Sequence, residues 1–185
     1  MIRNLRPEFL PLNEEVTLSE SEFSMLLLLV AGYRVRAHEV WSAGKADRVA
    51  AARELEQLEQ QRRADLARIL GERSAQVLAF EATLPLRAEV RLARMELDET
   101  SWPMTDEQSR NFLKAMIATF PDLPATPRSG AENPEAIAQE EEALMDQADS
   151  RILRAAQRVM TGAQYAHYAQ YLEGRRMFRR DTEDE

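Results

Sequence analysis

The residues of this chain best suited to metal binding or proton transfer are two histidines, His38 and His167. Di-iron sites in helical bundles use Glu-x-x-His pairs, but the residues three positions before these histidines are Val35 and Gln164. The chain also lacks a His-Glu-x-x-His, a Gly-x-Ser-x-Gly and a glycine-rich phosphate-binding motif. We therefore expect no catalytic residue, no metal and no cofactor. A metal site formed by the two histidines and a carboxylate stays open as an alternative.

Composition narrows the chemistry further. The chain has no cysteine, which excludes disulfides, thiolate catalysis and zinc sites built on cysteine. Its formal net charge is -8 over 185 residues. Such a surface repels a phosphate backbone, so we expect no nucleic-acid partner.

Three short phrases of one kind predict where helices begin. Each places a Ser or Thr three residues before a Glu or Gln, which is the order of a capping box. In such a box the hydroxyl accepts from an amide of the first turn, and the Glu or Gln accepts from the amide of the cap residue. The pairs are Ser19 with Glu22, Thr105 with Gln108, and Thr161 with Gln164.

The elements that carry these phrases are predicted to be helices throughout. Helix-forming residues dominate, there are only 6 glycines, and no segment alternates with the period of a strand. We expect an all-α fold without a β-sheet, an elongated or bent helical hairpin bundle of about five to six helices. The expected helices cover about 19–41, 46–70, 72–99 with a break at Pro85, 105–120, 134–159 and 161–180.

We expect a single all-helical domain over residues 1–185. Pro7 and Pro11 predict an irregular segment over 1–17. Four prolines predict a flexible loop over 121–134, and the last five residues, 181–185, read as an acidic tail.

The apolar run Met25–Ala31 is too short to span a membrane, because a spanning helix needs about 20 residues. It also makes a poor secretory signal, since Glu14, Glu15, Glu20 and Glu22 precede it. We expect no membrane insertion by this segment. The sequence is compatible with a processed or truncated form of a longer chain.

Two of the phrases carry a family resemblance. Met104-Thr105-Asp106-Glu107-Gln108 and Met160-Thr161-Gly162-Ala163-Gln164 resemble the paired Leu-Thr-x-x-Gln motifs of the Spy and CpxP group of bacterial periplasmic stress proteins. The resemblance implies an all-α bent hairpin, a periplasmic location and frequent dimers. It further implies binding of unfolded proteins without ATP, or adaptor action on a sensor kinase or protease.

From these observations we expect a non-enzymatic helical binding protein of the bacterial cell envelope, an ATP-independent chaperone or stress-response adaptor. Its partners would be unfolded or partner proteins, with a homodimer as a further expectation. The residues expected to contact clients or partners are Phe80, Met95, Tyr165, Tyr168 and Arg176. Two alternatives are the soluble scaffold region of a membrane-anchored protein and a metal-binding helical bundle.

Overall fold

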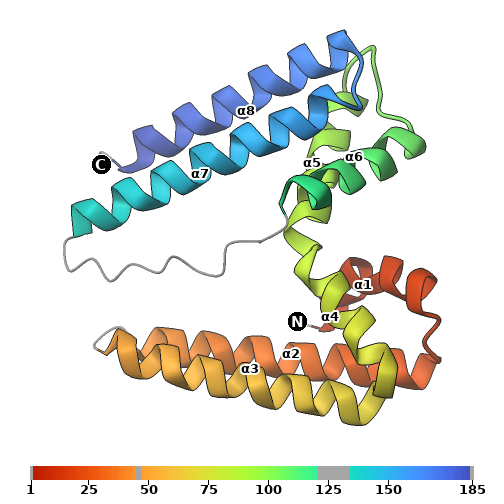
Figure 1. Ribbon diagram of the computed structural model, residues 1–185, viewed down its shortest axis with the longest axis vertical. Helices are drawn as coiled ribbons and strands as arrows, with labels where there is room; N and C mark the ends of the chain where they lie inside the picture. Colours follow the sequence, from red (N-terminus) through yellow and green to blue (C-terminus); the bar gives the residue numbers. More distant parts are fainter. Residues whose placement is uncertain (1, 45–46, 121–133, 184–185) are drawn as a thin grey trace. The chain divides into compact units, whose positions relative to one another are not determined.

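The protein is all-α (Figure 1). The computed structural model describes residues 2–44, 47–120 and 134–183, and this part of the chain contains no strand. The predicted fold class is therefore confirmed. The helices are α1 (Ile2–Val16), α2 (Glu20–Ala43), α3 (Arg48–Leu70), the 3-10 turn η1 (Gly71–Arg73), α4 (Ser74–Ala82), α5 (Leu84–Asp98), α6 (Asp106–Thr119), α7 (Pro134–Gln157) and α8 (Gly162–Glu183).

The chain divides into two compact units, an N-terminal unit over Met1–Ala82 and a C-terminal unit over Thr83–Glu185. This division differs from the single domain predicted over 1–185. The boundary falls where α4 ends and α5 begins, and Pro85 lies in the first turn of α5. A proline in that position lacks only an amide hydrogen that the helix start leaves unpaired anyway. The predicted break at Pro85 is confirmed.

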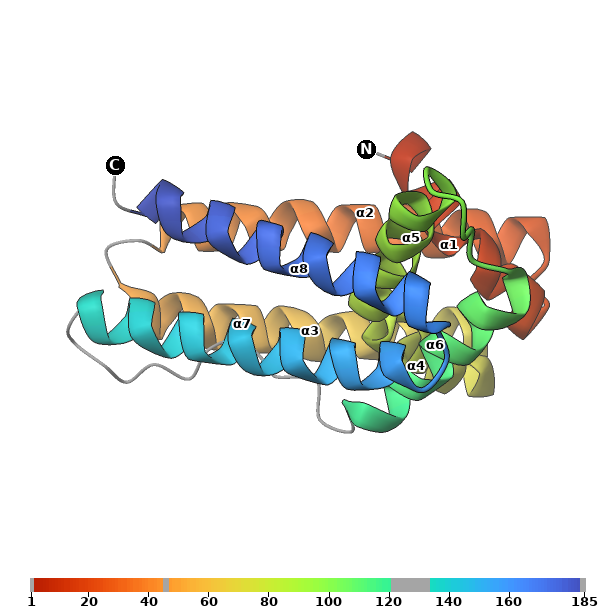
Figure 2. The same cartoon turned by 90° about the horizontal axis from the view of Figure 1, so that it is seen from above.

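The N-terminal unit is built on the antiparallel pair α2 and α3, which pack along each other (Figures 1 and 2). Both ends of α2 are capped. Ser19 and Glu22 form the predicted capping box at its start, and the amide of Gly44 donates to the carbonyl of Val40 at its end. Gly44 also permits a close approach, because a Cβ added there would lie 2.2 Å from the Cβ of Ala51 on α3.

The prediction that residues 1–17 are irregular is wrong. Residues 2–16 form the helix α1 with both prolines inside it. A proline inside a helix costs about 3 kcal/mol through its missing amide hydrogen and its crowding of the previous turn. The helix forms because one of its faces is buried, and each large apolar side chain contributes about 1.5–3 kcal/mol. The buried residues are Leu5, Phe9, Leu12 and Val16.

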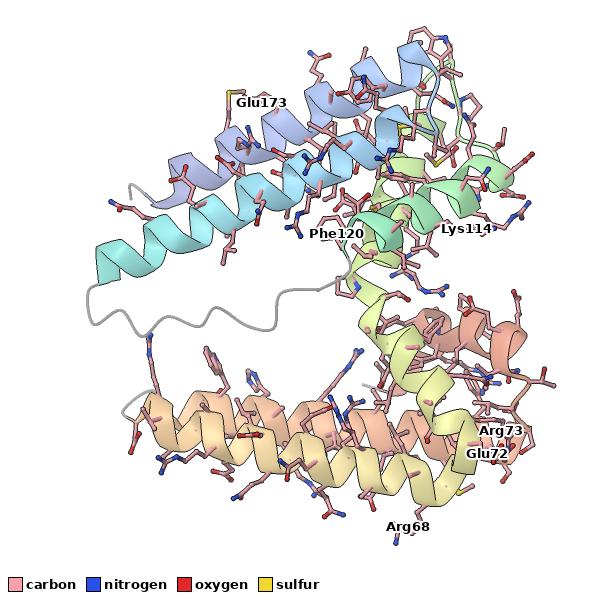
Figure 3. All side chains as sticks on the ribbon, viewed as in Figure 1. Arg68, Glu72, Arg73, Lys114, Phe120 and Glu173 are labelled. Carbon is pink, nitrogen blue, oxygen red and sulfur yellow. The ribbon has the colours of Figure 1, made fainter. Side chains whose placement is uncertain are left out.

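Ion pairs tie the helices of the N-terminal unit together. Arg34 on α2 binds both carboxylate oxygens of Glu8 on α1, at 2.7 and 3.0 Å. The hydroxyl of Tyr33 donates to the Asp65 carboxylate across α2 and α3. Arg73, which is labelled in Figure 3, donates to the Glu22 carboxylate of the capping box.

The C-terminal unit places the short helices α5 and α6 at one end of the α7–α8 pair (Figure 1). Its core draws on all four helices and includes Leu97, Phe112, Ala155, Tyr168 and Leu172. Phe120 closes the C-terminal end of α6 (Figure 3), and the Arg151 guanidinium of α7 lies 5.5 Å from its ring centroid.

The sequence also predicted a loop over 121–134 and an acidic tail over 181–185. The expected loop over 121–134 lies outside the described residues except for Pro134, which begins α7. Helix α8 continues to Glu183, so the first three residues of the expected acidic tail over 181–185 extend the helix beyond its predicted end near residue 180, and residues 184–185 lie outside the described part of the chain. Polar residues at a helix end do not stop the helix when no glycine or proline follows. Among the described residues, no helix combines the length and apolar character that crossing a membrane requires.

Candidate functional site

The two Met-Thr-x-x-Gln phrases lie next to each other in the C-terminal unit, at the starts of α6 and α8. At the start of α6, the Thr105 amide donates to Gln108 Oε1 at 3.1 Å, and the Gln108 amide donates to Thr105 Oγ1 at 3.1 Å. At the start of α8, the Thr161 amide donates to Gln164 Oε1 at 2.9 Å, and the Gln164 amide donates to Thr161 Oγ1 at 3.4 Å. Both predicted capping boxes are therefore formed.

The two boxes also bind each other through their glutamine amides. Gln108 Nε2 donates to Gln164 Oε1 at 2.8 Å, and Gln164 Nε2 lies 3.3 Å from Gln108 Oε1. Each glutamine side-chain amide also donates to a backbone carbonyl of the other phrase. That carbonyl belongs to the residue two positions before the threonine. Gln164 Nε2 donates to Pro103 O at 3.0 Å, and Gln108 Nε2 to Val159 O at 3.4 Å. We call this reciprocal arrangement the glutamine junction.

Glutamine suits this junction because one side chain both donates and accepts. The carbonyl oxygen of each glutamine closes its own helix start, which leaves the amide hydrogens for the opposite box. A glutamate could close the helix start but could not donate when ionised. Gln164 is only 3 % exposed, so its polar atoms need the partners they have here.

The methionines of the two phrases anchor the junction to the core. Met104 and Met160 are both buried and belong to the same apolar cluster as Phe112 and Tyr168. The rings of Phe112 and Tyr168 meet edge to face, with centroids 6.0 Å apart. Each phrase therefore joins an apolar anchor to a capped helix start.

A second polar group links α5, α7 and α8 farther along α8. The Tyr168 hydroxyl donates to Glu89 Oε1 at 2.5 Å, and Arg175 Nη1 donates to Glu89 Oε2 at 3.0 Å. Arg175 Nη2 also reaches Asp149 Oδ1 at 3.3 Å. Arg176 Nε lies 2.9 Å from Asp146 Oδ1. We call these residues the charged cluster.

Burial and the neighbouring Glu89 carboxylate raise the pKa of Tyr168 far above its usual value. The phenol therefore stays protonated and acts as a donor. The guanidinium groups of Arg175 and Arg176 offset the carboxylates of Glu89 and Asp149. Pairing of this kind is required for charges held out of water. The charged cluster thus fixes three helices against one another.

The five residues predicted to contact clients differ in how far they are exposed, and three of them reach the surface at least in part. Met95 on α5 is 65 % exposed, and Tyr165 on α8 is half-buried against the core. Arg176 is also half-buried, and its guanidinium is engaged by Asp146.

The other two, Phe80 and Tyr168, are corrected. Phe80 is buried in the N-terminal unit, its ring centroid 5.8 Å from that of Phe9. Tyr168 is fully buried in the core of the C-terminal unit. Both lie on the packed faces of their helices, so neither can meet a client in the folded protein. Glu89, Asp149 and Arg175 were not predicted, although Tyr168 and Arg175 are seven residues apart and therefore share one face of α8.

The two histidines, proposed as ligands of an alternative metal site, lie in different units of the chain. His38 is exposed on α2 in the N-terminal unit, whereas His167 lies on α8 with Nε2 3.4 Å from Glu96 Oε1. Within residues 2–44, 47–120 and 134–183, no group of three or more His, Asp or Glu side chains is placed to hold an ion.

An exposed apolar strip lies on α5. Leu92 and Met95 are three residues apart and both exposed, and Arg91 and Arg94 flank them on the helix surface. Trp102, in the segment between α5 and α6, is also half exposed, and its carbonyl accepts from Gln164 Nε2 at 3.3 Å. We call Leu92 and Met95 the apolar strip of the C-terminal unit; Trp102 is a further exposed apolar residue of the same unit.

Two hollows lie between α2 and α3. The larger, of about 650 Å³, is open and lined by Arg36, Glu39, Leu58 and their neighbours, while Trp41 and Arg48 border a smaller one of about 260 Å³. Neither contains a nucleophile beside a base among its described lining residues.

No protein-family model, curated protein or solved structure matches the chain.

Proposed function

We propose that this protein is a non-enzymatic helical binding protein of the bacterial cell envelope. It would act as an ATP-independent chaperone or stress-response adaptor, in the manner of the Spy and CpxP group that its phrases resemble. The observation that carries the proposal is the glutamine junction. The two phrases on which the resemblance rests lie together and bind each other.

The apolar strip supplies the surface that such a protein needs. Unfolded clients expose apolar side chains, and a flexible methionine adapts to side chains of different shape. Met95 is 65 % exposed, and the neighbouring Arg91, which is also exposed, can meet acidic segments of a client. The proposed contact residues are therefore Leu92, Met95 and Trp102.

The direct test is suppression of aggregation of a chemically denatured client, measured by light scattering without nucleotide. We expect protection at a few-fold molar excess of the wild-type chain. The double variant Leu92→Ser with Met95→Ser should lose most of this protection, because it removes apolar surface without disturbing a buried residue. Ile117→Ser on α6 is the matched control, since Ile117 is also exposed in the same unit. Absence of protection by the wild type would refute the chaperone proposal.

Client binding can also be followed directly through Trp102. The chain has two tryptophans, so Trp41→Phe leaves Trp102 as the single reporter. A client that covers Trp102 should shift the emission of this residue to shorter wavelength. An unchanged spectrum at a client concentration that shows protection would place the client elsewhere.

A further inference from the structure

The outward face of α2 in the N-terminal unit is apolar where a helix surface is usually charged. Met25, Leu28 and Val35 are 42 %, 58 % and 37 % exposed. With Gly32 they follow the spacing 3, 4, 3, which places all four residues on one side of the helix. The opposite side, which includes Phe23, Leu26 and Val30, is buried in the unit's own core. Helix α2 is therefore apolar on two sides, and one of them is uncovered.

Gly32 has no role within the chain that would require a glycine. A Cβ added there would meet nothing within 4 Å, and the residue lies in the middle of α2. A glycine inside a helix costs about 1 kcal/mol relative to alanine. A glycine on an exposed apolar face does provide one thing, a shallow notch into which a side chain of another helix fits.

The four residues are complementary to a second copy of themselves. When two α2 helices run antiparallel about a two-fold axis near residue 30, Leu28 of each copy faces Gly32 of the other. In the same register Met25 faces Val35. Large side chains thus meet a notch or a medium side chain, and every contact occurs twice, as in an isologous interface.

The polar ends of the face fit the antiparallel arrangement and oppose the parallel one. Ser21 and Ser24 lie at one end of the face, and Arg36 and Glu39 lie at the other; all four are exposed. Antiparallel pairing places the serines opposite Arg36 and Glu39. Parallel pairing would instead place Arg36 against Arg36 and Glu39 against Glu39, which repels.

We propose that the outward face of α2 pairs with the same face of a second copy of this chain, as an antiparallel two-fold dimer. The seam spans residues 25–35, about 15 Å of helix. An interface of this length lies at the small end of specific interfaces, so the dimer forms reversibly and at high protein concentration. A lipid surface is disfavoured as the occupant, because the chain has a net charge of -8.

Sedimentation equilibrium of the full chain tests the proposal, over protein concentrations from about 10 µM to about 1 mM. The wild type should shift from monomer to dimer within this range. Leu28→Glu should raise the dissociation constant at least about tenfold, because it places an unpaired charge in the seam. Ile117→Glu is the matched control, since Ile117 is also exposed but lies in the other unit. It should leave the dissociation constant unchanged.

The register is tested by a pair of opposite charges. Met25→Lys and Val35→Glu should each weaken the dimer alone, whereas the double variant should recover it, since the lysine of one copy then faces the glutamate of the other. A parallel dimer would not recover. Thermal melts by circular dichroism check that the variants fold. A wild type that stays monomeric, a Leu28→Glu variant that dimerises normally, or a double variant that is not rescued would each overturn the proposal.

Discussion

At the scale of single residues, the phrases that open helices do more than cap them. The sequence predicted each hydroxyl and each Glu or Gln as a local pair, and the pairs are present. The side-chain amide of each glutamine, however, hydrogen-bonds to the other glutamine, which lies 56 residues away in the chain. Local pattern therefore predicted the caps, while the glutamine junction could not be predicted from either phrase alone.

Replacing Gln164 by alanine tests the junction. Gln164 loses hydrogen bonds to Gln108, Pro103 and the Thr161 amide in a buried position, so we expect a loss of about 2 kcal/mol of unfolding free energy. Gln108→Ala should cost about 1 kcal/mol, because Gln108 is less buried. Gln170→Ala, exposed on the same helix α8, is the control and should change little. Urea unfolding followed by Trp102 fluorescence in a Trp41→Phe background reports on the C-terminal unit.

The threonine hydroxyls are tested separately. Thr105→Ala and Thr161→Ala each remove an acceptor for a first-turn amide, and each should destabilise the C-terminal unit by about 1 kcal/mol. Thr105→Ser keeps the hydroxyl and should restore most of the loss. Equal melting curves for the alanine and serine variants would show that the hydroxyl contributes nothing.

Glu22 makes the N-terminal capping box sensitive to acid. Its hydrogen bonds from the Ser19 amide and hydroxyl, followed by that from Arg73, lower the pKa of Glu22 from 4.5 to about 2. Because the folded pKa is lower than the unfolded one, the stabilisation is complete above about pH 4.5 and is lost as the pH falls towards 2. We expect the urea midpoint of Glu22→Gln to lie below that of the wild type at pH 7. The two midpoints should converge near pH 2, and a gap that stays constant with pH would contradict this.

At the scale of elements, the predictions from sequence that proved wrong are those that depended on which side of a helix is buried. Pro7 and Pro11 predicted a break, yet α1 is helical because its apolar face is covered. Phe80 and Tyr168 were predicted to contact clients, but the residue type alone does not say which side of a helix is packed. The helix ends at Gly44 and near Pro85 were predicted, because the residues that stop a helix act locally.

The close approach of α2 and α3 depends on Gly44. Gly44→Ala would bring two Cβ atoms to 2.2 Å, so the hairpin must shift and we expect a loss of about 1–3 kcal/mol. Gly174→Ala on α8 is the matched control. Its Cβ would meet nothing within 4 Å, and the better helix propensity of alanine should stabilise α8 by up to about 1 kcal/mol. Thermal melts of the two variants should therefore move in opposite directions.

At the scale of the whole molecule, each unit has its own buried apolar residues and its own ion pairs. We predicted one domain because 185 residues are long enough for a single domain with its own core. Whether a break inside a helical pattern separates two cores depends on contacts between distant residues. A single sequence does not contain that information in its local pattern.

The two-unit division predicts that the C-terminal unit folds alone. A fragment of residues 83–185 retains the core, the glutamine junction and the charged cluster. We expect a helical circular dichroism spectrum and a cooperative thermal transition for this fragment. A fragment that is unfolded at 20 °C would show that the N-terminal unit is needed for its stability.

The mutual dependence of Gln108 and Gln164 has a consequence for ancestry. Loss of either side-chain amide removes the hydrogen-bond partner of the other glutamine and leaves a backbone carbonyl of the junction without its donor. Substitutions at the two positions should therefore occur together. Distant descendants of the same ancestor should keep both hydroxyl-x-x-Gln phrases even after the helices between them have diverged in sequence. The number of residues between the two phrases can change among such descendants, whereas the two phrases should be kept or lost together.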